Sequence, residues 1–215
     1  LSPWLIGFCT FVLYPIANSL YWSFTTKRYG KPARWVGLEN YRLLADNPDL
    51  TRALRNTAYL ALIGMPIRLA IALLAAALLA TPRRGNGAYR VLFYVPATVP
   101  AVASGAMFFV LLREGGPISA LFELFGSEAP LWFRDPQWAK PALIMVGVWA
   151  LGDVMLVFLA GLVDVPRSLY EAIELDGARR WGRFRHVTLP MVSPVIFFTV
   201  LTGLIGVLQS FDQAY

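Results

Sequence analysis

Five long apolar stretches constrain this chain more than any other feature of its sequence. They cover residues about 1–24, 57–80, 91–112, 142–163 and 191–210. A helix needs about 20 apolar residues to cross roughly 30 Å of hydrocarbon, so each stretch is long enough for one crossing. The sequence therefore predicts an all-α polytopic membrane protein, with residues 1–215 forming a single transmembrane domain.

The composition excludes an ordinary soluble domain. Hydrophobic residues make up 57% of the chain and charged residues 15%, and the mean hydropathy is +0.56. Soluble domains carry about 25% charged residues. The formal charge of +6 lies in the loops between apolar stretches and not in a separate basic domain, so we expect membrane lipid and not nucleic acid as a partner.

The sequence offers little to catalysis. Cys9 and His186 are the only cysteine and histidine, which is too few for a Cys/His metal site. A phosphate-binding loop ends in Lys followed by Ser or Thr, whereas the three lysines are followed by Arg28, Pro32 and Pro141. We therefore predict no catalytic residue, no metal site and no cofactor in this chain.

The distribution of charge does not decide which loops lie on the cytoplasmic side of the membrane. The loops after the first and third stretches hold ten Lys or Arg residues, and those after the second and fourth hold eight. The first and third loops are also rich in aromatic residues, Gly and Pro, so short helices are expected there at about 38–44 and 118–125.

The fourth loop, at about 164–190, is too polar to span and too patterned for a plain connector. Ser168 and Glu171 have the S-x-x-E spacing of a capping box, which predicts a helix at about 169–176. Gly177 then suits the left-handed conformation that ends many helices. A second segment at 178–187 would place Trp181 and Phe184 on one side, before Pro190 opens the last span.

Two roles are open for this loop. The arginines and aromatics of its second segment suit a helix lying on the bilayer. The first segment carries three acids in six residues, Glu171, Glu174 and Asp176, which an anionic leaflet would repel. Docking into a protein groove is therefore favoured for the first segment.

The stretch YEAIELDGARRWGRFRHVTLP resembles the EAA loop of the permease subunits of binding-protein-dependent ABC importers. Its D-G-A and W-x-x-F are similar to the carbohydrate-uptake branch. Ile173 replaces the second alanine of the pattern, and Val187 replaces an isoleucine. LYPIANSLYWSF with WVGLENY, RVLFYVPATVP and GVLQSFDQAY also resemble parts of these subunits, so the similarity covers nearly the whole chain.

The resemblance implies a six-helix core of which about five helices lie here, the sixth and the true N-terminus being outside this piece. It places the EAA loop in the cytoplasm as a coupling helix, in a bacterial or archaeal plasma membrane. It implies ABC ATPase subunits that hydrolyse ATP, a second related permease subunit, an extracytoplasmic solute-binding protein, and a carbohydrate-like cargo such as a sugar or glycerol phosphate. The residues that it implies for ATPase coupling are Glu171, which would cap the helix and meet a basic group on the partner, Ala172, Ile173, Asp176, Gly177, Ala178, Phe184 and Pro190.

Polar residues at membrane depth are the candidates for a substrate pathway, because they are expensive to bury in lipid. Asp153, beside Trp149, could contact sugar hydroxyls, or it could be a structural charge neutralised by Arg68. Both explanations are open. Gln209 and Ser210 are further pathway candidates, whereas Asp212 fits an interfacial position.

The alternative hypothesis is a stand-alone membrane protein, either an ion-coupled carrier or an intramembrane enzyme. A carrier would bury several ionisable residues in its spans, and this chain offers two deep ones. An enzyme would need a catalytic dyad or metal set that the sequence lacks.

Overall fold

The computed structural model describes residues 2–26 and 33–209 and divides the chain into two compact units, Leu1–Arg55 and Asn56–Tyr215. Four helices are long and apolar enough to cross a membrane: Ser2–Ser23, Pro48–Ala80, Ala101–Leu124 and Arg180–Leu208. Pro136–Trp149 and Gly152–Val163 form a bent pair that passes the same test together. The expectation of about five crossings is thus confirmed.

The first unit opens with an apolar helix formed by α1 (Ser2–Phe8), the π-helical η1 (Cys9–Leu13) and α2 (Tyr14–Ser23). Strands β1 (Thr25–Thr26) and β2 (Arg34–Trp35) then pair antiparallel, with Thr25 opposite Trp35. The short helix expected at 38–44 is present as α3 (Glu39–Ala45). Phe24 joins α2, β2 and α3, because its ring lies 5.5 Å from the ring of Trp35 and 5.6 Å from that of Tyr41.

Helix α4 (Pro48–Tyr59) starts in the first unit, and the second unit is built from helices alone within the described residues. In chain order these are η2 (Leu60–Gly64), α5 (Met65–Ala80), α6 (Asn86–Tyr94), η3 (Val95–Thr98), α7 (Ala101–Leu112), α8 (Pro117–Leu124), α9 (Pro136–Trp149), α10 (Gly152–Val163), α11 (Arg167–Leu175), α12 (Arg180–Arg183), η4 (Phe184–Thr188) and α13 (Leu189–Leu208). Helix α8 confirms the second short helix, expected at 118–125.

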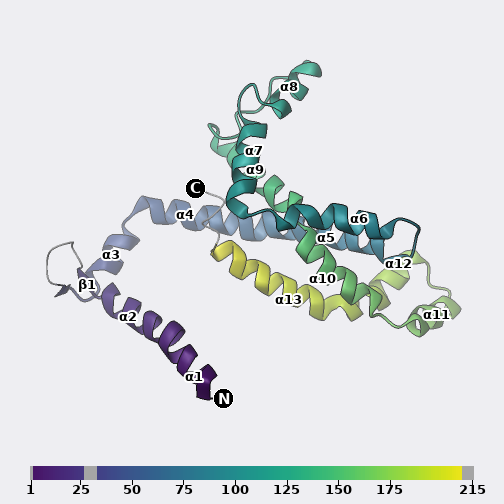
Figure 1. The fold of residues 1–215 in the computed structure, drawn as a ribbon, viewed down its shortest axis with the longest axis horizontal. Coiled ribbons are helices and arrows are strands. Elements are labelled where there is room, and N and C mark those ends of the chain that lie inside the picture. Colours follow the sequence, from purple (N-terminus) through teal and green to yellow (C-terminus); the bar gives the residue numbers. More distant parts are fainter. Residues whose placement is uncertain (1, 27–32, 210–215) are drawn as a thin grey trace. The chain divides into compact units, whose positions relative to one another are not determined.

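Helices α5, α10 and α13 lie side by side and enclose the main core (Figure 1). Helix α5 contributes the small residues Ala72 and Ala76, which allow close approach, while Met155 and Phe158 come from α10. Gly161 of α10 lies so near α13 that a Cβ atom there would be 2.8 Å from Val195. Close packing of small residues therefore fixes these three helices against one another.

Prolines explain the π-helical segments. Pro15, Pro66 and Pro190 each occupy the second position of the α-helix that follows a π-helical segment. A proline ring collides with the carbonyl four residues earlier and lacks an N–H to bond it. The wider π turn moves that carbonyl away, which lets all three helices continue through the proline.

The structure corrects the continuity of two predicted spans. The third, at 91–112, is broken between α6 and α7, because Pro96 and Pro100 interrupt the helix and Val99 before the second proline is extended. The fourth, at 142–163, bends by 51° between α9 and α10. The last span also begins earlier than predicted, at Arg180, since the π turn carries the helix through Pro190.

Candidate functional site

Helix α11 forms the first half of the patterned loop, as the sequence predicts, but its start differs. Pro166 is the N-cap, with φ −61° and ψ 132°, and no side chain caps the helix. The expected capping box of Ser168 and Glu171 is therefore wrong. The extended Pro166 lets the helix begin at Arg167, which places Ser168 inside the first turn and away from the capping position.

The end of α11 agrees with prediction. Gly177 has a positive φ of 78°, and the segment closes in a Schellman motif. The Gly177 N–H donates to the carbonyl of Glu174 at 3.0 Å, and the Ala178 N–H donates to that of Ile173 at 3.1 Å. A residue with a side chain would be strained at Gly177, although the space around it is open.

One face of α11 is fastened to the start of the last span. The hydroxyl groups of Tyr170 and Thr188 are hydrogen-bonded at 2.9 Å, and Ile173 packs on the core formed partly by Val187. Glu174 forms an ion pair with Arg183 of α12. These contacts join α11 to α12, η4 and α13.

The opposite face of α11 is free of the rest of the described chain. Glu171 and Ala172 are exposed, and Leu175 is 90% exposed. Leu175 is absent from the residues implied for ATPase coupling, although it lies four residues after Glu171 and three after Ala172 on the same face. Leu175 thus adds apolar area to the outer face of α11.

The eight residues implied for coupling thus divide between two surfaces. Glu171, Ala172, Asp176 and Gly177 are exposed around the outer face of α11, and Pro190 is exposed at the start of α13. The half-buried residues are Ile173, Ala178 and Phe184, whose ring stacks on Trp181 at 5.5 Å. The first group is accessible on the surface, while the second is packed against the rest of the described chain.

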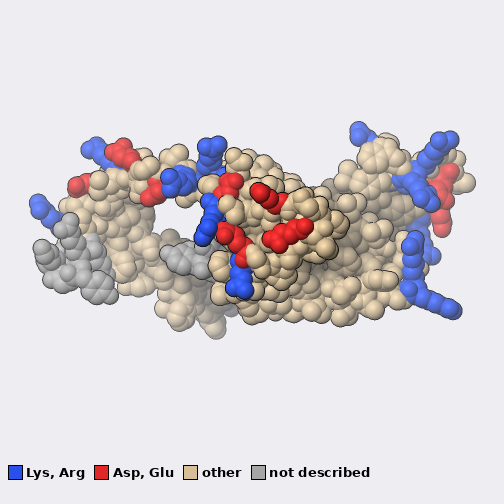
Figure 2. All heavy atoms as spheres, turned by 90° about the horizontal axis from the view of Figure 1, so that it is seen from above, with Lys and Arg blue, Asp and Glu red and all other residues tan. Residues whose placement is uncertain are grey.

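Basic residues gather at the end of the second unit where α11, α12 and the connection from α5 to α6 lie (Figures 1 and 2). Two sequence loops rich in arginine therefore share one end: Arg83 and Arg84 come from the first, and Arg179 and Arg180 from the second. Arginine-rich short loops are typical of the cytoplasmic side. This end is the one that the EAA resemblance assigns to the cytoplasm.

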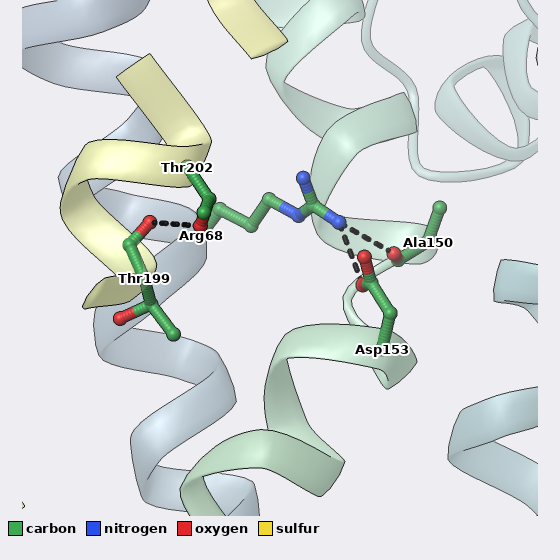
Figure 3. Close-up of polar contacts among 5 residues, drawn as sticks. All are labelled: Arg68, Ala150, Asp153, Thr199 and Thr202. Atoms are coloured by element: carbon green, nitrogen blue, oxygen red, sulfur yellow. Dashed lines mark hydrogen bonds and ion pairs between the residues drawn. The ribbon is translucent and has the colours of Figure 1, made fainter. Parts of the chain in front are cut away.

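A second polar site lies where α9 bends into α10. A terminal nitrogen of Arg68, on α5, donates to a carboxylate oxygen of Asp153 at 2.8 Å and to the carbonyl of Ala150 at 3.0 Å (Figure 3). The bend frees this carbonyl from the helix. Residues 85 positions apart are thus joined, which shows that Asp153 is neutralised by Arg68. The Asp153 side chain remains 60% exposed and that of Arg68 31%, so the pair is also open on one side.

The other pathway candidates lie in different surroundings. Trp149 is half-buried and meets Phe108 edge-on at 5.6 Å, inside a second small core. Gln209 is exposed at the end of α13, and Ser210 and Asp212 lie outside the described residues. The sequence predicted no role for Gly152, where an added Cβ would overlap the backbone of Phe93 and Tyr94.

Comparison with known families decides what kind of protein carries these features. Residues 68–215 match the family described as binding-protein-dependent transport system inner membrane component. The chain belongs to that family. Two relatives align with the whole chain at 36% identity. One is a probable ABC transporter permease of Bacillus subtilis, of which the alignment covers 71% of the length. The other is the lactose transport system permease of Rhizobium radiobacter, of which it covers 73%.

The fold of this permease also matches a solved transporter. A bacterial ABC transporter that imports the acidic polysaccharide alginate superposes with a TM-score of 0.80 at 25% identity, over 97% of this chain and 71% of that one. The permease is thus the multi-pass inner-membrane component of an ABC importer. A stand-alone carrier or intramembrane enzyme does not fit this membership.

Proposed function

We propose that this permease moves a sugar or sugar-like solute, delivered by an extracytoplasmic binding protein, and that ATPase subunits drive it through the outer face of α11. The observation that carries the proposal is the two-sided geometry of α11, which is fastened to the last span on one side and open on the other. A second related permease subunit would complete the pathway. The sugar-like cargo is supported by the relatives named for lactose and alginate.

In this proposal the ATPase grips α11 and moves it when the ATPase subunits close on ATP. The Tyr170–Thr188 hydrogen bond and the packing of Ile173 transmit the motion to α13. Helices α5 and α10 share a core with α13, so these helices would move as one body and alternate access to the pathway. The chain needs no bound cofactor for this role.

The exposed residues of α11 have distinct roles in the grip. Glu171 offers a carboxylate to a basic group of the ATPase. Ala172 is small enough for close contact, and Leu175 supplies apolar area. Gly177 allows the turn, and Asp176 extends the acidic rim beside it.

A photo-crosslinking experiment tests this contact. In a Cys9→Ser background, Ala172→Cys labelled with benzophenone maleimide is expected to crosslink to the ATPase subunit of the co-purified transporter. Leu124→Cys is the matched control, because Leu124 is also highly exposed but lies on α8. Crosslinks from both positions, or from neither, would refute the assignment of α11.

We further propose that the open side of the Arg68–Asp153 pair faces the transport pathway, with Trp149 and Gln209 as further lining residues. The pair lies between apolar helices, where contact with lipid would be costly. A water-filled pathway or a partner helix therefore covers its exposed side. Carboxylate and guanidinium groups at such a site can hydrogen-bond sugar hydroxyls.

Charge removal separates the structural role of this pair from a pathway role. Arg68→Met or Asp153→Asn alone is expected to reduce the yield of assembled transporter, because an unpaired charge at membrane depth costs roughly 2.5–3.5 kcal/mol. The double variant should restore assembly but change the KM or the solute preference of uptake. The exposed pair Arg52–Asp49, at 3.4 Å, is the control. Arg52→Gln should change neither the yield of assembled transporter nor the KM of uptake. Wild-type kinetics in the double variant would leave the pair with a structural role only.

A further inference from the structure

A hollow of about 240 Å³ lies between the end of α7 and the segment that leads into α9. Its floor is formed by Leu112 and Trp132, which are buried. Its wall is formed by Phe109 and Phe133, whose ring centroids are 5.2 Å apart and whose exposed fractions are 56% and 46%. The hollow therefore presents aromatic surface around a packed base.

The floor of the hollow packs against residues on its buried side. The ring of Trp132 meets Trp138 edge-on at 5.2 Å and Phe122 at 6.4 Å, and Trp132 belongs to the same core as Leu112. Because two aromatic contacts and a core surround Trp132, the base of the hollow keeps its shape without a ligand. A preformed site loses less free energy to ordering when a ligand binds.

The rim of the hollow is charged. Arg134 and Glu114 form an ion pair at 3.0 Å, and both side chains are largely exposed. A charged pair would not be stable in hydrocarbon, so the rim faces water. Aromatic faces beside carboxylate and guanidinium groups match a pyranose ring, whose C–H face packs on an aromatic ring while its hydroxyls accept and donate hydrogen bonds.

Size limits the ligand. Pockets that enclose a drug-sized molecule measure about 300–1,000 Å³, so a hollow of 240 Å³ accommodates one ring of a larger saccharide. The crossing formed by α9 and α10 separates the hollow from α11. The hollow is therefore on the side opposite the coupling helix, where cargo arrives.

We propose that this hollow, lined by Phe109, Phe133, Trp132 and the Arg134–Glu114 pair, is a saccharide subsite at the extracytoplasmic mouth of the permease. The inference rests on the proposed sugar-import function. The subsite takes one pyranose ring through Phe133 and Phe109, and the ion pair binds the ring's hydroxyls. It keeps cargo released by the binding protein at the mouth of the pathway.

The test is saturation-transfer NMR on the complete transporter in nanodiscs, without ATP and without the binding protein. The probes are lactose and sorbitol, an open-chain polyol that has no ring face. Lactose is expected to bind with a dissociation constant on the order of millimolar, and sorbitol is not. Phe133→Leu should weaken lactose binding about two- to ten-fold, because an aromatic contact is lost while apolar volume is kept.

The matched control is Phe125→Leu, since Phe125 is exposed on the same loop region but does not line the hollow. Equal lactose signals in the two variants, or equal binding of lactose and sorbitol, would overturn the subsite and identify the rings as a membrane-interface belt. Stimulation of ATP hydrolysis by sugar-loaded binding protein is measured on the same samples. If sugar-loaded binding protein does not stimulate ATP hydrolysis in the wild type, the sugar-import function itself is refuted. A failure of the subsite is therefore distinguishable from a failure of the proposed function.

Discussion

Replacing Gly177 with valine is expected to abolish most sugar uptake while leaving the transporter assembled. Gly177 has φ 78°, a conformation that a β-branched residue adopts only at a cost of about 1–3 kcal/mol. The two hydrogen bonds of the Schellman motif depend on this turn. Strain there would shift α11 in its contact with the ATPase, and 1–3 kcal/mol corresponds to about a 5- to 150-fold loss of the docked geometry.

The measurements are sugar uptake and the stimulation of ATP hydrolysis by sugar-loaded binding protein. Both should fall together, because coupling and not ATP chemistry is affected. Gly177→Asn should retain most activity, since asparagine tolerates positive φ. These readouts separate a defect in coupling from a defect in folding.

Gly126→Val is the matched control for backbone strain. Gly126 also has a positive φ, 72°, and open space around it, but it ends α8 and not α11. Its replacement should lower thermal stability by a similar amount and leave coupling intact. Unchanged coupling in an assembled Gly177→Val transporter would refute the role of the turn.

The local features of the fold followed from the sequence. Apolar length located the membrane helices, and the polar loop with Gly177 at its end predicted α11 and its left-handed turn. Both depend on residues close together in the chain, whose preferences packing did not override. The capping box failed for the same local reason, because Pro166 competes with Ser168 for the N-cap position.

The non-local features were beyond the sequence. The Arg68–Asp153 pair joins residues that only the packing of α5 against α10 brings together, so polarity marked both as unusual but left their pairing open. The bend between α9 and α10 has no proline to signal it. The outer face of α11 became clear only when Tyr170 and Ile173 were found fastened to the other side.

That bend leads to a second large expected effect. Gly152→Ala should strongly destabilise the permease, because a Cβ atom at this position would overlap the Phe93 carbonyl oxygen and lie 2.7 Å from the Tyr94 Cα. These are backbone atoms at the end of α6, so rotation of a side chain cannot relieve the overlap. Overpacking of this kind costs about 1–3 kcal/mol, which predicts a fall in Tm of roughly 2–12 °C for a domain of this size.

Gly147→Ala isolates the cause of this effect. Gly147 lies on the other side of the same bend, but its Cβ would meet only the Arg68 Cδ, at 4.0 Å, so the added methyl group fits. Alanine also suits a helix interior better than glycine, by about 0.5–1 kcal/mol, and the Tm of this variant should stay level or rise. In Gly152→Ala, α6 should move away from the bend, which should also displace the Ala150 carbonyl from Arg68. The KM for uptake is therefore expected to change together with the Tm. Equal Tm values for the two variants would show that α6 does not pack on Gly152 in the assembled transporter.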